Sequence, residues 1–128
     1  MTKVSEASKQ VLDKIWELAE QNGGGCKLNN NKTFMPLSIE KLGKKAITIC
    51  HYGEQNGDLM RDPEMIFWKD ERGEYTPYYF RNDYVGAEEF VGVLAGGILK
   101  ITDEKQQKAQ AEFADMWLNN IKEQQELA

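Results

Sequence analysis

Apolar residues recur at three- and four-residue spacing near the start of the chain, which predicts an amphipathic helix over residues 4–21. Ser5 can cap the first turn, because a serine oxygen accepts hydrogen bonds from the unpaired amides there. Asn22-Gly23 supplies a residue suited to the left-handed conformation that ends many helices. Trp16 falls at the edge of the apolar stripe and is expected to be half-buried. The stripe consists of Val4, Val11, Leu12, Ile15, Leu18 and Ala19.

A second pattern with helical spacing follows Asp103 and predicts a helix in the last part of the chain. Asp103 is a suitable N-cap, and Gln106 stands three residues later, where its side chain can bond back to the cap. The predicted inward stripe is Ala109, Phe113, Met116, Trp117, Asn120 and Ile121, and the side chains expected to face water include Lys105, Lys108, Glu112, Asp115 and Lys122.

Between the helices, apolar and polar positions alternate with the spacing of β-strands. Glycine and asparagine triplets within 23–31 predict a flexible connection, and the polar stretch 53–63 predicts a long connection between two strands. Pro77 cannot donate to a sheet ladder, so its strand is expected at an edge or at a bulge. The predicted strands are 34–42, 46–52, 65–69 and 75–81, with a small irregular hairpin formed by 91–95 and 98–101.

Helices at both ends of a set of hairpin-connected strands predict an α+β fold, with residues 1–128 as a single domain. We expect the two helices to pack on an antiparallel sheet of four or more strands, as a two-layer sandwich. A chain of 128 residues is long enough to build its own hydrophobic core.

Composition narrows the setting of the protein. No apolar run approaches the roughly 20 residues that span a bilayer, and the first residues lack the apolar stretch of a secretion signal. The expected location is therefore the cytoplasm. Cys26 and Cys50 are expected to stay reduced there, because a domain of this size does not need a disulfide.

The net charge of −5 is unevenly distributed along the chain. Residues 1–50 carry eight lysines against five acids, residues 51–75 carry seven acids against three bases, and residues 76–128 carry nine acids against five bases. An acidic protein is a poor candidate for nonspecific binding to phosphate backbones. A local basic surface within the first fifty residues could still contact nucleic acid.

The segment 56–68 combines a turn, dense charge and the start of an apolar strand. Asp58, Asp62 and Glu64 supply oxygen ligands that suit Mg²⁺ or Ca²⁺, but their spacing is not that of an EF-hand. The structural interpretation is that Asp58 closes the turn and Arg61 pairs with a nearby acid. A role in contacting another protein is the third interpretation, and we assign no metal here.

Candidate catalytic groups are few. His51 is the one histidine of the chain, and it adjoins Cys50. Neighbours in a strand point to opposite faces, whereas a nucleophile and its base must meet within hydrogen-bond reach. Glu88 and Glu89 are paired carboxylates, but nothing indicates that they share a pocket. We therefore expect a protein that is not an enzyme, with no catalytic residue and no cofactor.

Six aromatic residues cluster in the third and fourth predicted strands and just beyond them. Such a set can stack single-stranded bases, but it then needs interleaved basic residues, and this region is acidic. Alternating tyrosines more often pack across strands, and exposed ones serve as hot spots of protein interfaces. The residues are Trp68, Tyr75, Tyr78, Tyr79, Phe80 and Tyr84.

Two motifs carry a resemblance to a known family. The first motif is the run NGDLMRDPEM at residues 56–65, followed by Phe67, Pro77, Tyr79, Asn82 and Asp83. The second motif is the run EFADMWLNNI at residues 112–121. The chain resembles a family of small uncharacterised domains of bacteria, phages and conjugative elements. The likeness extends from Ile47 to Gln124. It implies a setting in mobile elements, whose small acidic accessory proteins often bind and blunt host defence systems. The family has no established activity, so no catalytic residue carries over.

We therefore expect a non-enzymatic accessory protein of a phage or conjugative element that binds a host protein. The specific hypothesis is inhibition of a nucleic-acid-targeting defence system, of the antirestriction or anti-CRISPR type. An acidic surface would dock on a basic groove of the host protein, because complementary potentials favour such a pairing. The predicted partner-binding residues are Glu54, Asp58, Arg61, Asp62, Glu64, Asp70, Glu71 and Glu74, with Tyr75 and Tyr78 as aromatic anchors.

Two alternatives stay open at this point. The first is a small nucleic-acid-binding module, whose binding should fall steeply with salt. The second and weaker one is a metal-dependent enzyme, which the metal ion should stabilise against heat. The nucleic-acid-binding module would use Lys27, Lys32, Lys41, Lys44 and Lys45.

Overall fold

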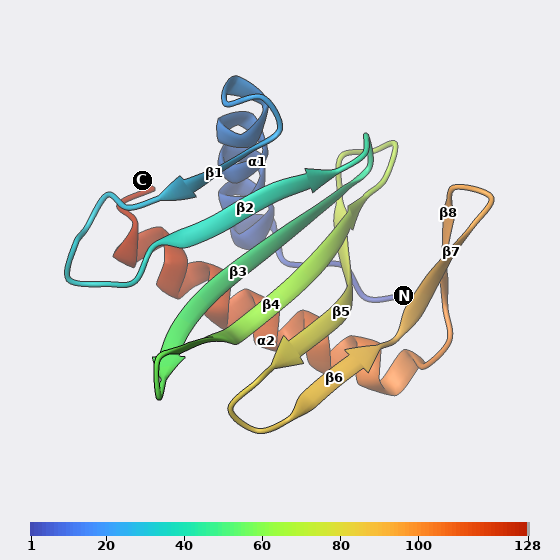
Figure 1. Cartoon of the computed structure of the whole chain (residues 1–128). Coiled ribbons are helices and arrows are strands. Elements are labelled where there is room, and N and C mark those ends of the chain that lie inside the picture. The colour runs from blue at the N-terminus through green and yellow to red at the C-terminus, as the bar shows by residue number, and fades with distance from the viewer. Residues whose placement is uncertain (128) are drawn as a thin grey trace.

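A computed structural model describes residues 1–127 as two helices and eight strands (Figure 1). The strands lie between the helices in the chain, as the sequence predicts. Their order and bounds are α1 (Glu6–Gln21), β1 (Gly25–Leu28), β2 (Leu37–Leu42), β3 (Ala46–Gln55), β4 (Asp58–Lys69), β5 (Tyr75–Asn82), β6 (Ala87–Phe90), β7 (Gly92–Ala95), β8 (Ile98–Ile101) and α2 (Glu104–Gln124).

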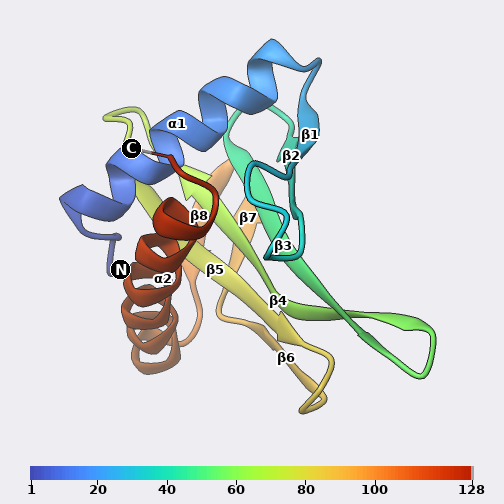
Figure 2. The same cartoon turned by 90° about the vertical axis from the view of Figure 1, so that its left-hand side faces the viewer.

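The large sheet is antiparallel and has six strands, β1 to β6, in the order in which they occur in the chain. Both helices pack on one of its faces, which we call the helix face, and the opposite face is the open face (Figures 1 and 2). The predicted α+β fold is confirmed. Neither helix within residues 1–127 combines the length and the apolar content needed to cross a membrane. The helix face of the sheet contributes Leu37, Ile39, Ile47, Ile49, Met65, Phe67 and Tyr75 to the main core.

The first helix has the predicted cap and the predicted inward stripe. Ser5 Oγ accepts a hydrogen bond from the Ser8 amide at the start of α1. Trp16, however, is only 6% exposed, so the expectation that it would be half-buried is wrong. The ammonium groups of Lys41 and Lys69 lie over its ring, 4.7 and 4.6 Å from the centroid, and cover the part of the indole that the core does not.

The buried face of α2 differs from the predicted stripe. Asp103 caps the helix as expected, by accepting from the Gln106 amide. Ala109, Met116 and Asn120, which were expected to point inward, are exposed. The prediction failed because glutamines, which have no apolar signature, occupy two of the inward positions. The buried residues of α2 are Gln107, Gln110, Ala111, Ala114, Trp117, Leu118 and Ile121.

Gln107 holds the start of the chain in place. It is completely buried, and its Oε1 accepts a hydrogen bond from the Thr2 amide at 2.7 Å. Its Nε2 donates to the Thr2 carbonyl at 2.7 Å and to the Pro77 carbonyl at 3.1 Å. Asp115, which was expected to face water, likewise accepts from the Ser5 amide and from the Ser8 hydroxyl. Polar side chains of α2 therefore attach the N-terminal segment to the fold.

The small hairpin of β7 and β8 forms a second sheet of two strands, as predicted. It packs over one end of the open face, where it makes a second core. This core contains Tyr78, Tyr79, Val91 and Leu99, with Ile66, Trp68 and Ile101 packed against it.

Three connections differ from the sequence-based expectations. Gly25–Leu28 forms β1 inside the stretch predicted as a flexible connection, and Ala87–Phe90 forms the unpredicted strand β6. The predicted long connection over 53–63 is wrong, because β3 and β4 continue through it to a tight turn. Asn56 and Gly57 have φ values of 52° and 84°, which is the backbone geometry of a two-residue hairpin turn with a right-handed strand twist.

Pro77 lies at a bulge, which confirms one of the two predicted alternatives. The register between β4 and β5 shifts between Ile66 and Phe67, so that Tyr79 pairs with Ile66 while Pro77 pairs with Phe67. The neighbouring strand β6 pairs with β5 only from Tyr79 onward. No ladder hydrogen bond from the proline nitrogen is therefore needed.

Candidate functional site

The most distinctive surface feature is a hairpin that projects beyond the sheet (Figure 2). Pairing between β2 and β3 ends at His51, and pairing between β4 and β5 begins at Glu64. Residues 52–61 of the β3–β4 hairpin therefore have only each other as strand partners. We call these residues the arm.

The tip of the arm, residues 54–59, is exposed and carries two acids and no base. Glu54 and Leu59 are paired across its strands, and Gln55 pairs with Asp58 next to the turn, as the structural interpretation of Asp58 predicts. Glu54 and Asp58 are exposed, and Leu59 keeps 66% of its surface in solvent. Leu59 therefore presents an exposed apolar side chain beside the acids Glu54 and Asp58.

Asp83, in the turn between β5 and β6, anchors the base of the arm. Its Oδ2 accepts a hydrogen bond from the Arg61 amide at 2.8 Å, and its own amide donates to the Arg61 carbonyl at 2.9 Å. Its Oδ1 accepts from Arg81 Nε at 2.8 Å. The Arg61 amide and then the Arg81 guanidinium hold the pKa of the Asp83 carboxyl below its usual range.

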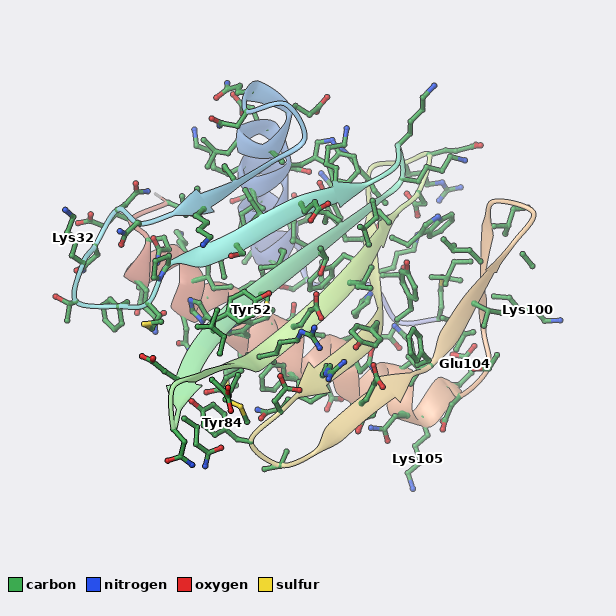
Figure 3. The ribbon with its side chains drawn as sticks, viewed as in Figure 1. Lys32, Tyr52, Tyr84, Lys100, Glu104 and Lys105 are labelled. Carbon is green, nitrogen blue, oxygen red and sulfur yellow. The ribbon has the colours of Figure 1, made fainter. Side chains whose placement is uncertain are left out.

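Further contacts complete the anchor. Asn82 Nδ2 donates to Asp62 Oδ1 at 2.9 Å. Tyr84 lies against the arm at Gly53, where any Cβ would collide with the tyrosine hydroxyl (Figure 3). The β5–β6 turn therefore fixes the direction in which the arm projects. The spacing of Asn82 and Asp83 in the sequence does not by itself reveal this contact.

Glu64 lies on the open face at the foot of the arm. Its Oε2 accepts from Thr48 Oγ1 at 2.9 Å, and its Oε1 lies 3.6 Å from Arg61 Nε. The predicted pairing of Arg61 with a nearby acid is thereby confirmed. Among residues 1–127 no group of three side chains is placed to hold a metal ion, and Asp58, Asp62 and Glu64 are not brought together.

The other predicted acids lie at the far end of β4. Lys3 Nζ binds Asp70 Oδ2 at 2.8 Å and Glu74 Oε1 at 3.1 Å, and these bonds raise the lysine pKa. Since β4 has 12 residues, at roughly 3.3 Å per residue its two ends lie about 36 Å apart. The structure therefore divides the predicted acidic surface into an arm end and a turn end. Of the three predicted acids at the turn end, Asp70 and Glu74 are half-buried and Glu71 is exposed.

Two predicted aromatic anchors are wrong. Tyr75 is completely buried and Tyr78 is 8% exposed, so neither offers a contact surface to a partner. Tyr75 lies under the helices, where its hydroxyl donates to Asp13 at 2.8 Å, and Tyr78 belongs to the second core. Alternation along a strand predicts which residues share a face, but not that both faces of β5 are covered.

The five lysines of the nucleic-acid alternative do not form one patch. Lys41 is engaged, since its ammonium lies over Trp16 and 3.8 Å from Glu20. Lys27 and Lys32 lie on β1 and in the following loop. Lys44 and Lys45 occupy the turn at the other end of β2.

His51 and Cys50 point to opposite faces of β3, as the strand geometry predicts. The His51 ring packs edge-on against Trp117, with 5.9 Å between ring centroids, on the helix face. Cys50 is 3% exposed, and burial raises the pKa of its thiol to about 12. Such a thiol stays protonated and is a poor nucleophile.

Burial makes His51 a source of pH-dependent stability. Burial lowers its pKa from the ordinary value of 6.5, while the nearby Asp62 opposes that shift. The unfolded chain therefore takes up this proton at a higher pH than the folded protein does. The histidine's contribution to stability is fully present above pH 6.5 and is lost as the pH falls through that value.

We expect the melting temperature of the native protein to fall more steeply between about pH 7 and 5.5 than the melting temperature of the variant His51→Gln. Parallel melting curves of the two proteins over this range would contradict the assignment.

A groove of about 710 Å³ lies on the open face beside β1. This volume is within the range of roughly 300–1,000 Å³ typical of ligand sites. Two exposed apolar side chains flank it, Met35 at 48% and Leu59 at 66% exposure. Figure 3 shows Tyr52 on the same face of the sheet. Its lining includes Gly25, Lys27, Met35 and Ser38 from β1, β2 and the loop between them, and Tyr52 and Leu59 from the base and side of the arm. No motif in the sequence predicted this groove.

Fold and site together define a two-layer α+β protein with a partly open sheet face, a lateral groove and a projecting acidic hairpin. The chain belongs to the family described as Domain of unknown function (DUF6908), whose model matches residues 9–127. The expected membership in a family of uncharacterised domains is confirmed, and the match includes most of α1, beyond the motifs that suggested it. Searches of the curated proteins and of the solved structures found no match.

Proposed function

We propose that this protein is a non-enzymatic accessory protein of a phage or conjugative element, and that its arm docks on a basic surface of a host protein in the cytoplasm. The observation that carries the proposal is the arm itself. It is acidic, projects from the sheet and is held by the β5–β6 turn rather than left free. A rigid projecting element binds with a smaller loss of conformational entropy than a flexible loop.

The charge around the arm fits a basic partner. Residues 53–64 and 81–89 together contain seven acids against two arginines. Both arginines are used within the anchor, Arg61 on Glu64 and Arg81 on Asp83 and Glu88. The acids of the tip, Glu54 and Asp58, have no such partner among residues 1–127 and are free to steer association.

A basic groove that normally holds nucleic acid is the partner class that this surface fits best. The narrow acidic hairpin presents charge along two adjacent strands, and Leu59 supplies an apolar contact at its centre. Inhibition of a nucleic-acid-targeting defence effector, of the antirestriction or anti-CRISPR type, is the corresponding function. The mechanism is stoichiometric occupation of the groove.

Affinity capture from host lysate tests the proposal with matched charge variants. The native protein should retain one host protein after nuclease treatment, and the double variant Glu54→Lys, Asp58→Lys should lose it. The control Glu17→Lys, Glu112→Lys changes the net charge equally at exposed helix positions and should retain the partner. Equal capture by both variants, or loss of all captured protein on nuclease treatment, would overturn the proposal.

A further inference from the structure

The free edge of β1 and the groove beside it form a second surface, which does not depend on the arm's proposed role. β1 is the terminal strand of the large sheet, and no strand lies beyond it in either view (Figures 1 and 2). Lys41 donates its amide to the Gly24 carbonyl at 2.7 Å. Because bonded and unbonded positions alternate in an antiparallel pair, the amides and carbonyls of Gly25 and Lys27 point away from β2.

The groove lies on the face toward which Lys27 points. Lys27 pairs with Ser38, Ser38 with Cys50, and Cys50 with Glu64, so all four side chains share the open face. An extended segment added along β1 would bond to Gly25 and Lys27 and direct every second side chain over the groove. The edge would supply main-chain hydrogen bonds, and the groove would select side chains.

The charged side chains beside β1 indicate which residues a bound peptide segment should carry. Lys27 is exposed and makes no ion pair within residues 1–127, whereas Lys41 is paired with Glu20. Glu40 faces the same side next to Gly25, with which it pairs. An acidic residue is thus favoured opposite Lys27 and disfavoured opposite Gly25. On the other side of Lys27, toward Met35, the exposed thioether favours an apolar residue.

We propose that the β1 edge and groove bind an extended peptide segment of another protein by strand addition. The segment carries an acidic residue opposite Lys27 and an apolar residue two positions further, toward Met35. The bonds to Gly25 and Lys27 fix its register, and the ion pair with Lys27 selects its sequence.

A second copy of the chain fits this edge less well. Antiparallel pairing of two β1 strands through Gly25 and Lys27 would place the two Cys26 residues opposite each other. It would also bring both Lys27 side chains onto one face as diagonal neighbours, where like charges repel. A short edge strand bearing a lysine is a common protection against such self-pairing.

The experiment starts from a phage-displayed library of random dodecapeptides selected on the immobilised full chain. The selected peptides should share an acidic and an apolar residue two positions apart. A synthetic peptide with that consensus is then titrated by fluorescence anisotropy, and its contacts are located by amide chemical-shift changes at residues 23–28.

Two substitutions of Lys27 distinguish the contribution of its backbone amide to peptide binding from that of its side chain. Lys27→Pro removes the outward amide without breaking a bond to β2, and proline is tolerated on edge strands. Lys27→Glu keeps the amide and reverses the charge. Each should weaken peptide binding by about tenfold, the equivalent of one or two lost hydrogen bonds. Lys44→Glu, outside the groove, should change nothing. Asp58→Lys, on the arm face opposite Leu59, should also leave peptide affinity intact, which separates this site from the acidic tip that the proposed function uses.

Three results would overturn the inference. The first is selection of no peptide above the level of an empty support. The second is peptide affinity that is equal in the native protein, Lys27→Pro and Lys27→Glu. The third is a covalent dimer that forms under mild oxidant, is lost in Cys26→Ser and persists in Cys50→Ser. Two opposed cysteines at a Cα separation of about 4.5 Å can form a disulfide, so this dimer would assign the edge to a second copy.

Discussion

Replacing Gln107 by alanine should lower the free energy of unfolding by about 3 kcal/mol, because a completely buried side chain with three hydrogen bonds is removed. The substitution leaves the amide and carbonyl of Thr2 and the carbonyl of Pro77 without these partners. Unpaired buried polar groups cost more than the net value of the bonds they lose. Urea denaturation followed by tryptophan fluorescence, with an unchanged m-value, measures the loss.

Two further variants isolate the cause. Gln106→Ala removes a glutamine of the same helix whose side chain makes no hydrogen bond among residues 1–127, and it should change stability by less than about 0.5 kcal/mol. Gln107→Leu keeps the side-chain volume and removes only the polar contacts, so it should resemble Gln107→Ala. If Gln107→Ala is as stable as Gln106→Ala, the N-terminal segment is not part of the cooperative fold.

Replacing Asp83 by alanine should release the arm while the rest of the protein stays folded. Arg61 then loses the acceptor of its amide, and Arg81 loses its closest carboxylate. We expect amide hydrogen exchange in residues 53–61 to approach the rate of an unstructured peptide. Exchange at the core positions Ile47 and Phe67 should stay slow. Unchanged exchange in the arm would show that the hairpin is held by its own strand pairing alone.

The same anchor should weaken in acid. The pKa of Asp83 is lowered in the folded protein, so its contribution is present above its ordinary value of 3.8 and is lost as the pH falls through the folded pKa. Asp83→Ala has no such carboxylate. Its arm amides should have low protection factors, measured against the intrinsic exchange rate at each pH, over the whole range, whereas the native arm should lose its protection only in acid. The double variant Glu54→Lys, Asp58→Lys keeps Asp83 and should follow the native pH profile.

The helices could be predicted from the sequence because their signals are local. Ser5 and Asp103 cap α1 and α2 as expected. The inward face of α2 could not, since Gln107 is buried by partners that lie at residues 2 and 77. A polar residue with distant partners has the same appearance in a sequence as a solvated one.

The candidate site was predicted in part. The segment 56–68 was singled out from the sequence, but its charge density obscured the hairpin signal of Asn56-Gly57. Nothing in local spacing shows that β4 separates Asp58, its first residue, from Asp70, which directly follows its last residue. The anchor at Asp83 and the groove beside β1 depend on strand pairing, which a single sequence does not specify.

The succession of hairpins in the large sheet has a consequence for biosynthesis. Each strand from β1 to β6 neighbours the strand made just before it, so the sheet can pair progressively as the chain leaves the ribosome. Its helix face, with Ile47 and Phe67, is covered by Trp117 and Leu118 only after α2 has been made. The nascent protein thus passes through a stage in which the sheet is paired and α1 has been made, but the part of the helix face that α2 covers is still bare. A bare apolar surface of this kind is one that chaperones recognise.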